Sequence, residues 1–515
     1  MDFKDPVYNE VAKNKVERLY QKLYPELQQG GNPPVGSTLD VVRFRDMHSR
    51  VAPFDVDLTS KIGNTKLPFP LFSASMDTLS GPKMAQVLSE VGGCGVLYRT
   101  KDPEKQLQWA KEVIDRKPCL VPEPMCVHPN DTLEKTWDIL EEYDFSTIPV
   151  TDEDNILNGI LFTRDIAYMV KNRMSESVRD WMVPFEELKV EKFKTPYAQI
   201  KNRLLNEPQC SVLPVVNEKK QFQGIYFMKD FFINMDAAMH KGKPLCGIAV
   251  NEDPQDLDRV KRALNIGVGV IVVESSHGNC PPIIEQVKKI KEITGDEATV
   301  IGGNIANIDG YIRLAEAGAD AIKCGIGSGS ICTTSQVTGV GVPMFSLIRE
   351  LNFTKRELEK EGFPAPEIIA DGGINGPGEM SVSLAAGANG CMAGKWLVGF
   401  EESISCQEGN ITQDGYVHYR GMASKRSIKK RMAAGRYDKQ KKAPEGVEGK
   451  VPFRGPLKQG IGEDDQGIGE DIELIQGGLA HAGAETIEEF HRIANSTPHF
   501  FIGFNQGGKQ IKPNI

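Results

Sequence analysis

A short apolar run opens into a glycine-rich loop at Ala321-Ile322-Lys323-Cys324-Gly325-Ile326-Gly327-Ser328-Gly329-Ser330-Ile331-Cys332-Thr333-Thr334. Residues 321–324 are typical of a short buried strand. The glycines and serines that follow can neither pack a core nor hold a helix, so they form a loop. Successive backbone N–H groups after a strand make a cradle for an anion such as a phosphate.

Cys332 lies at the far end of this loop, and Thr334 adds a hydroxyl two residues later. A thiol beside a phosphate cradle suggests a nucleophile aimed at a phosphorylated substrate. The alternative is a glycine-rich turn that carries a buried structural cysteine. These residues alone do not separate the two interpretations.

The same strand-and-loop pattern recurs along the chain, with a helix and a glycine before each new strand. Buried parallel strands separated by helices that end on glycine indicate βα units. Eight such units predict a (β/α)₈ TIM barrel rather than an open sheet, with its chemistry on the loops after the strands. The candidate strands are residues 67–72, 94–98, 245–250, 268–273, 298–301, 321–324, 367–370 and 390–393.

The regular spacing breaks once, because residues 117–235 are far too many for one βα connection. They hold two similar units, each with a helix, a Pro-Val strand, a hairpin and a Gly-Ile strand that closes on an aspartate. This repeat resembles a tandem pair of CBS modules (a Bateman domain), whose closing Thr or Ser and Asp bind purine nucleotides. Thr163 and Asp165 match that motif, whereas the second unit keeps Asp230 but has Met228 at the hydroxyl position. The alternative is a pair of structural units inserted as a spacer.

Bulk composition excludes several classes of protein. The chain has 515 residues and a formal net charge of −9, which argues against a general nucleic-acid or membrane-surface binder. No apolar run approaches the ~18 residues that span a bilayer, and the start does not read as a signal peptide. Ten cysteines without a C-x-x-C pair disfavour zinc sites and a disulfide framework. We therefore expect a cytoplasmic protein with no membrane or nucleic-acid partner.

Polar residues follow four further candidate strands, and a barrel brings such residues to one rim. A carboxylate such as Asp371 suits a ribose diol, because it accepts hydrogen bonds from two hydroxyls. The glycines near it offer further N–H groups to a phosphate. These rim segments are Glu274-Ser275-Ser276, Gly302-Gly303-Asn304, Asp371-Gly372-Gly373 and Gly394-Lys395.

From about residue 40 to 490 the sequence resembles the inosine-5′-monophosphate (IMP) dehydrogenase family, which also includes GMP reductases. The inserted CBS pair follows the second βα unit, as in that family. The motifs that carry the resemblance are residues 73–78, 274–279, 302–304, 325–334, 338–341, 369–374 and 419–422.

The resemblance implies NAD-dependent oxidation of IMP to XMP, a step of guanine nucleotide synthesis. The Cys332 thiolate would attack C2 of the purine, and the covalent thioimidate left after hydride transfer to NAD⁺ would be hydrolysed. It implies catalytic roles for Cys332, Thr334, Arg436, Tyr437 and Glu445. The implied substrate-binding residues are Ser330, Asp371, Gly373, Gly394, Lys395, Tyr419, Gly421, Met422 and Glu445.

The resemblance also implies cofactors and partners. Glu274, Ser275, Ser276, Asn304 and Gly325 would bind NAD, and the main-chain carbonyls of Gly327, Gly329 and Cys332 would hold K⁺. Thr163, Asp165 and Asp230 would bind purine nucleotides such as ATP or GTP. Homotetramers that can pair into octamers are the family's assembly.

These assignments divide the chain into an N-terminal arm (1–35), the barrel (36–116 and 236–500), the CBS pair (117–235), a mobile catalytic flap (421–450) and a tail (501–515). The flap is strongly basic, and its alternative interpretation is a solvated helix and loop. Arginine rarely gives up a proton, so transfer from Thr334 to Glu445 is the easier route for activating water.

Two rival functions remain open. One is GMP reductase, which deaminates GMP to IMP with NADPH; its members mostly lack the Arg436-Tyr437 pair of the flap. The other is a CBS-barrel nucleotide sensor without turnover, against which the intact Cys332, Thr334 and Arg436 argue. The chain also departs from the family with Glu274 in place of Asp and with Lys395 in place of Ser.

Overall fold

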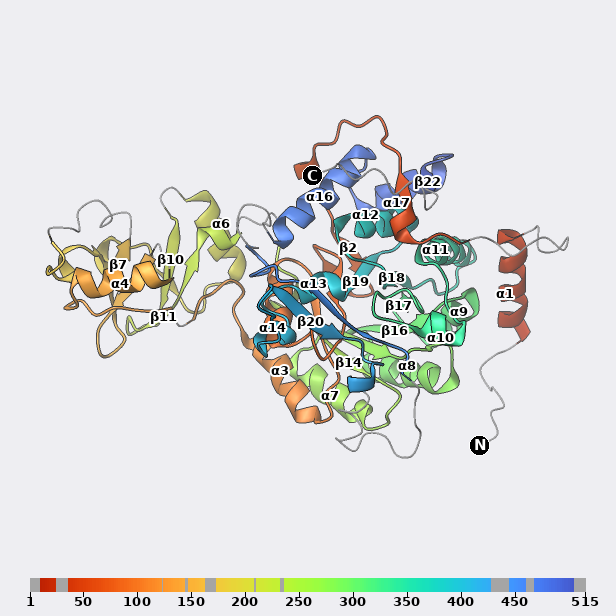
Figure 1. The fold of residues 1–515 in the computed structure, drawn as a ribbon, viewed down its shortest axis with the longest axis horizontal. Coiled ribbons are helices and arrows are strands. Elements are labelled where there is room, and N and C mark those ends of the chain that lie inside the picture. Colours follow the sequence, from red (N-terminus) through yellow and green to blue (C-terminus); the bar gives the residue numbers. More distant parts are fainter. Residues whose placement is uncertain are drawn as a thin grey trace. The chain divides into compact units, whose positions relative to one another are not determined.

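The computed structural model describes residues 10–24, 36–122, 124–143, 147–162, 173–207, 210–231, 236–427, 444–459 and 467–503. The chain forms two compact units (Figure 1). The larger comprises Met1–Arg116 and Met235–Ile515, and the smaller comprises Lys117–Asn234.

The larger unit is built on a closed barrel of parallel strands, which confirms the predicted (β/α)₈ fold. Apolar side chains of all eight strands meet in its interior or against the surrounding helices, so both faces of the sheet are buried. In order around the barrel the strands are β4 (Leu71–Ser73), β5 (Cys94–Leu97), β14 (Cys246–Val250), β15 (Val270–Glu274), β16 (Thr299–Ile305), β17 (Ala321–Cys324), β18 (Glu367–Asp371) and β19 (Gly390–Ala393).

Helices surround this barrel (Figure 1). Local signals fix their ends: Asp102 and Asn307 cap two of them by accepting hydrogen bonds from backbone N–H groups, and Gly267 and Gly387 end two others in the left-handed conformation. The helices between the strands are α2 (Pro82–Glu90), α3 (Pro103–Asp115), α7 (Asp256–Ile266), α8 (Pro281–Thr294), α9 (Ile308–Glu316), α11 (Met344–Lys360) and α12 (Pro377–Ala386). After β19, α16 (Ile468–His481) and α17 (Ile487–Ser496) pack on α12.

The structure corrects the first predicted strand, residues 67–72. Leu67 ends a separate hairpin, β2 (Ser60–Ile62) with β3 (Thr65–Leu67), and the barrel strand begins only at Leu71. Pro68 and Pro70 lie between them, and proline lacks the N–H that a central strand must donate. The predicted tail also begins later than residue 501, because β22 (Phe501–Gly503) pairs antiparallel with β1 (Val42–Phe44).

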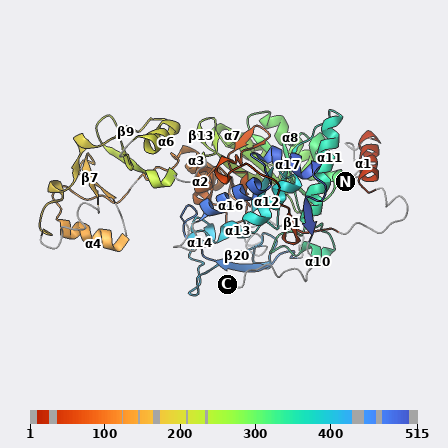
Figure 2. The ribbon, with the colours of Figure 1, turned by 90° about the horizontal axis from the view of Figure 1, so that it is seen from above.

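The N-terminal arm contains a helix, α1 (Glu10–Leu23), beside α11 (Figures 1 and 2). Basic side chains of α1 face acidic side chains of α11 and of the turn after it. Lys22 Nζ lies 2.6 Å from Glu357 Oε2, and Arg18 pairs with Glu361 at 2.5 Å. The arm is thus held to the barrel's outer helices by ion pairs.

The smaller unit contains the same arrangement twice. In the first half α4 (Leu133–Tyr143) precedes a hairpin of β6 (Thr147–Thr151) and β7 (Leu157–Phe162); in the second, α6 (Tyr197–Asn206) precedes β10 (Val212–Val216) and β11 (Phe222–Phe227). Both hairpins are irregular at the same place, after Val150 and after Val215. One apolar cluster, which includes Ile160 and Ile225, joins the halves.

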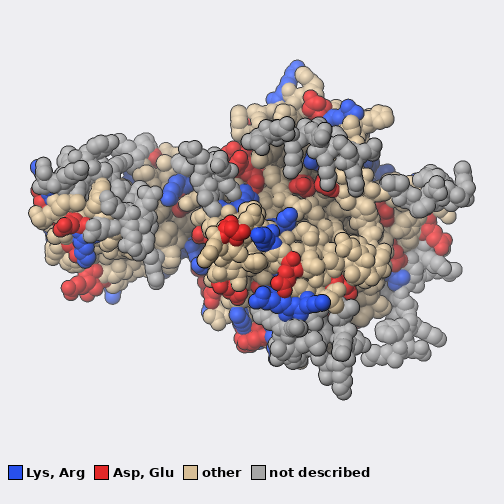
Figure 3. Space-filling view, in the orientation of Figure 1, with Lys and Arg blue, Asp and Glu red and all other residues tan. Residues whose placement is uncertain are grey.

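The described surface carries charges of both signs. On the face shown in Figure 3, acidic and basic side chains are interspersed, with no broad field of one sign among the described residues. Within those residues, no helix is both long and apolar enough to cross a bilayer.

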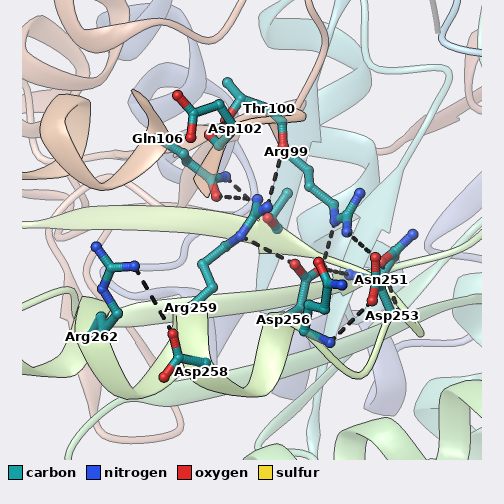
Figure 4. Close-up of polar contacts among 12 residues, drawn as sticks. Arg99, Thr100, Asp102, Gln106, Asn251, Asp253, Asp256, Asp258, Arg259 and Arg262 are labelled. Carbon is teal, nitrogen blue, oxygen red and sulfur yellow. Dashed lines mark hydrogen bonds and ion pairs between the residues drawn. The ribbon is translucent and has the colours of Figure 1, made fainter. Parts of the chain in front are cut away.

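A buried ionic network fixes the loops after β5 and β14 (Figure 4). Asp256, fully buried at the start of α7, accepts a hydrogen bond from Arg99 Nε at 2.5 Å and lies 3.1 Å from Arg259 Nε. Arg259 also donates to Gln106 Oε1 and to the carbonyl of Thr100. Each charge in the network has an opposite partner, which offsets part of the cost of burying it, although burial still lowers the pKa of Arg259.

Candidate active site

The glycine-rich loop after β17 packs tightly against the loop after β18. A Cβ atom at Gly325 would lie 2.1 Å from the carbonyl oxygen of Asp371, and one at Gly372 would lie 2.3 Å from Ser328 Oγ. Both glycines also have positive φ, at +131° and +109°. Ser328 Oγ donates to the same Asp371 carbonyl at 3.1 Å. Glycine at these two positions is therefore required for the two loops to meet.

Cys332 begins a short chain of hydrogen bonds. Its Sγ donates to Thr334 Oγ1 at 3.2 Å, and Thr334 Oγ1 donates to Glu445 Oε2 at 3.1 Å. All three side chains are partly exposed. The structure thus brings together the predicted nucleophile, a hydroxyl and a carboxylate, although Glu445 is 111 residues from Thr334.

Main-chain pairing holds Glu445 at this position. The segment before β21 (Glu448–Pro452) runs beside the cysteine loop: Thr333 N donates to the Glu445 carbonyl at 2.9 Å, and Val447 N donates to the Ile331 carbonyl at 3.0 Å. β21 in turn pairs with β20 (Tyr416–Arg420), and Gly421 N donates to the Val447 carbonyl. The cysteine loop therefore lies against both ends of the segment predicted as a flap.

Three predicted substrate residues come from β20 and the turn after it. Tyr419 OH shares a hydrogen bond of 3.2 Å with Ser330 Oγ, and burial raises the pKa of Tyr419. Met422 Sδ accepts a hydrogen bond from Asp77 N at 3.4 Å, and the Asp77 side chain pairs with Arg420 at 2.6 Å. This connects the loop after β4, which carries Asp77, to the turn at residues 421–424.

A buried lysine lies between two of the predicted binding carboxylates. Lys323 Nζ, on β17, is 2.7 Å from Asp371 Oδ2 and 3.1 Å from Glu274 Oε1. Burial favours the neutral amine, but the two carboxylates outweigh it and raise the pKa of Lys323 above its ordinary value. The sequence predicts Lys323 only as part of a buried strand, although a lone lysine in an apolar run is a signal of a functional charge.

The predicted NAD-binding residues lie in two places: residues 274–276 lie at the end of β15, and Asn304 contacts the loop after β17 and the end of β18. Glu274 Oε2 accepts a hydrogen bond from the buried Ser75 Oγ of the loop after β4. Ser275 Oγ is used in its own turn, with His277, and Ser276 is exposed. Asn304 instead lies toward the end of β18, because its Nδ2 donates to Asp371 Oδ2 and to the Gly325 carbonyl, each at 2.8 Å.

A model of the IMP dehydrogenase / GMP reductase domain matches residues 36–504, most of the chain. The chain belongs to this family. Its curated relatives include inosine-5′-monophosphate dehydrogenases of Aquifex aeolicus, 33% identical over 92% of this chain and 94% of the relative, and of Escherichia coli K12, 32% identical over 89% and 93%. The sequence resemblance is thus confirmed.

Solved structures of the family share the fold. A cysteine-to-alanine variant of GMP reductase from Trypanosoma brucei aligns with a TM-score of 0.68 and 27% identity, covering 93% of this chain and 99% of that one. The same variant in complex with guanosine 5′-monophosphate aligns with a TM-score of 0.63 and 28% identity, covering 93% and 98%.

The remaining predicted substrate and metal residues of this family member lie on loops at the same end of the strands. Lys395 begins α13 (Lys395–Val398) directly after Gly394; its side chain is exposed and pairs with none of the described residues. The carbonyls of Gly327 and Cys332 accept no hydrogen bond from the described part of the chain, whereas that of Gly329 accepts one from Cys332 N. Two free carbonyls in one loop fit a monovalent cation, which takes oxygen ligands.

Four predicted residues lie outside the described parts of the chain. They are Arg436 and Tyr437 of the flap and Thr163 and Asp165 of the first CBS unit. Asp230 is described, in a short 3₁₀ turn of the smaller unit (Met228–Phe231), and its main-chain carbonyl accepts a hydrogen bond from Cys119 Sγ at 3.8 Å.

Proposed function

We propose that this protein is an IMP dehydrogenase that oxidises IMP to XMP with NAD⁺ and water, through a covalent intermediate on Cys332. The observation that carries the proposal is the hydrogen-bonded chain Cys332–Thr334–Glu445 at the carboxyl end of β17. It combines the nucleophile that the first stage needs with the route for a proton that the second stage needs.

In the first stage the Cys332 sulfur forms a bond to C2 of the hypoxanthine ring, which makes that carbon tetrahedral. When bound, NAD⁺ supplies the acceptor for the hydride that then leaves C2. The product on the enzyme is a thioimidate, in which C2 is still bonded to sulfur. The overall balance is IMP, NAD⁺ and water to XMP, NADH and a proton.

In the second stage water attacks C2 and the C–S bond breaks. Thr334 takes the proton of the attacking water and passes its own proton to Glu445, which is 3.1 Å away. A carboxylate is an ordinary proton acceptor near neutral pH, whereas the guanidinium of Arg436 hardly releases a proton. This supports the route through Thr334, while Arg436 and Tyr437 stay a sequence prediction.

The residues around the cysteine loop support binding of a nucleoside monophosphate. The backbone of residues 327–330 with Gly373 and Gly394 suits the phosphate, and Lys395 adds a positive charge there. Asp371 suits the ribose, because its Oδ2 is held by Lys323 and Asn304 while no described residue donates to its Oδ1. Ser330, Tyr419, Gly421 and Met422 would surround the base.

The cofactor side is lined by Glu274 and by the exposed Ser276, polar groups that suit the second ribose of a dinucleotide. The loop carbonyls of Gly327, Gly329 and Cys332 would hold K⁺, which would stiffen the cysteine loop. Removal of K⁺ should therefore lower kcat more than it weakens IMP binding.

Absorbance of the reduced nicotinamide separates the rival functions. NADH should form when the purified protein is given IMP and NAD⁺, and NADPH should not be consumed with GMP. Loss of NADPH with GMP alone would instead make the protein a reductase, as the T. brucei structures are named. No change in absorbance in either assay would favour a nucleotide sensor. The curated relatives named inosine-5′-monophosphate dehydrogenase, at 33% and 32% identity over most of the chain, support the first outcome.

We also propose that the smaller unit binds purine nucleotides as a CBS pair. Its doubled helix-and-hairpin arrangement supports this, with the first half carrying the full Thr163 and Asp165 motif. ATP or GTP should raise the melting temperature of the wild-type protein. An Asp165→Ala variant should lose most of that increase, while Asp230→Ala, in the half with Met228, should lose less.

A further inference from the structure

Lys323 occupies an unusual place for a charged residue. It is on the barrel strand β17 and only 4% exposed, between the buried Ile322 and Cys324. Its ammonium reaches the rim and contacts two carboxylates that come from different strands: Asp371 at the end of β18 and Glu274 at the end of β15. No other lysine or arginine among the described residues pairs with either carboxylate.

The two carboxylates have different tasks in the proposed function. Asp371 faces the substrate ribose, and Glu274 faces the cofactor ribose. Each has one other donor: Asn304 donates to Asp371 Oδ2, the oxygen that Lys323 also contacts, and Ser75 donates to Glu274 Oε2, whereas Lys323 contacts Oε1. Lys323 contacts both carboxylates. One ammonium therefore orients the carboxylate that would bind the IMP ribose and the carboxylate that would bind the NAD ribose.

We infer that Lys323 is a positioning residue that couples the IMP and NAD subsites by neutralising and orienting Asp371 and Glu274 together. This inference rests on the proposed function and adds a residue to it. Without the ammonium, the carboxylates of Asp371 and Glu274, which both lie against Lys323 Nζ, would be left close together with no positive charge between them. They would repel, and they would turn away or take up a shared proton. Either change removes acceptors from the ribose hydroxyls.

A substitution of Glu274 can distinguish this coupling from a merely structural role of Lys323 in measurements of IMP binding. Glu274 does not serve the IMP subsite, so its neutralisation alone should change IMP binding little. In a chain that lacks the Lys323 charge, however, Glu274→Gln removes the repulsion on Asp371. The second substitution should then restore IMP binding, because coupled sites do not behave additively.

The test is calorimetric titration of IMP, without NAD⁺, into wild type, Lys323→Met, Glu274→Gln and the double variant. Lys323→Met should weaken IMP binding by roughly 10-fold or more, the range for a lost charged hydrogen bond. The double variant should recover about three-fold or more of that loss. In steady state, Lys323→Met should raise KM for both IMP and NAD⁺, and Lys323→Arg should restore both.

Lys291→Met is the matched control. Lys291 Nζ pairs with Asp320 at 2.8 Å, and Asp320 lies just before the opposite end of the same strand, away from the rim. This variant should bind IMP like the wild type. If Lys323→Met does not fold, Lys323→Gln, which keeps a donor but no charge, should show the same loss and the same rescue.

Three results would overturn the coupling. They are wild-type IMP affinity in the uncharged Lys323 variants, no recovery in the double variant, or an equal loss in Lys291→Met. Wild-type protein that binds no IMP at all would instead refute the proposed function. The two failures are therefore distinguishable in one set of titrations.

Discussion

Main-chain hydrogen bonds, and not only the carboxylate, hold Glu445 beside the cysteine loop. The Glu445 carbonyl accepts a hydrogen bond from Thr333 N, and this bond holds the residue beside the cysteine loop independently of its carboxylate. A substitution of the side chain should therefore leave the loop in place. That makes Glu445 a suitable position for separating the two chemical stages.

In Glu445→Gln the hydride stage should proceed while hydrolysis slows by about 10²-fold, the usual contribution of one proton-transfer group. Rapid mixing with IMP and NAD⁺ should show a burst of NADH equal to the enzyme, followed by slow turnover. Glu448→Gln, an exposed position on the same segment, should behave like the wild type. A Glu445→Gln enzyme with no burst, or with unchanged steady turnover, would remove Glu445 from the water stage.

At the residue scale, sequence predicted those site residues whose chemistry is visible in a motif. The structure brings Cys332, Thr334, Asp371 and Glu445 close together: the first two follow β17 and the third ends β18, whereas Glu445 lies on the segment before β21. Lys323 was missed because an apolar strand hides its charge, and its partners are 48 and 49 residues away. Asn304 was expected to face the cofactor, but only coordinates reveal its contact with Asp371.

At the scale of the elements, the barrel strands could be predicted because each is a short apolar run that ends in polar residues. Two of the predicted strands, 321–324 and 390–393, match β17 and β19 at both ends. The first strand was wrong because two prolines divide an apolar run that looks continuous by hydrophobicity alone. The Asp256–Arg259 network could not be predicted, since its partners Arg99, Thr100 and Gln106 lie 153 to 159 residues earlier in the chain (Figure 4).

Asp256→Asn should destabilise the larger unit at the start of α7. The substitution leaves Arg259, which is 2% exposed, without its carboxylate partner, and breaking a buried pair costs about 3–5 kcal/mol. The check is the free energy of unfolding from denaturant titration. Asp258→Asn on the same helix is the control: its side chain is 75% exposed and lies 4.0 Å from Arg262, so it should change stability by less than about 0.5 kcal/mol. Equal effects of both variants would contradict the role of the network.

At the scale of the whole molecule, the insertion was predictable because about 120 residues cannot connect adjacent strands of a barrel. The sheet of β1 with β22 was not predictable, because it joins segments from near the two ends of the chain, more than 450 residues apart. Such long-range pairing leaves no local pattern. The packing of α17 on α12, next to this sheet, includes a half-buried histidine, His491, whose titration affects stability.

Burial lowers the pKa of His491, on α17, to about 4, while its Nε2 donates to the Ala388 carbonyl at 3.0 Å. Between pH 6.5 and 4 the unfolded chain takes up a proton at this ring and the folded protein does not. The folded state therefore loses stability as the pH falls through this window. The loss from pH 7 to 5 should be about 1–2 kcal/mol larger in wild type than in His491→Gln. Parallel stability curves for the two proteins in denaturant would contradict this.

The most direct measurement of the central claim is mass spectrometry of the enzyme quenched in acid during turnover with IMP and NAD⁺. We expect a purine nucleotide covalently attached to the peptide that carries Cys332, dependent on both ligands and absent from Cys332→Ala, which should still bind IMP. An enzyme that forms NADH without any adduct on Cys332, or a Cys332→Ala variant that still turns over, would contradict covalent catalysis by this residue.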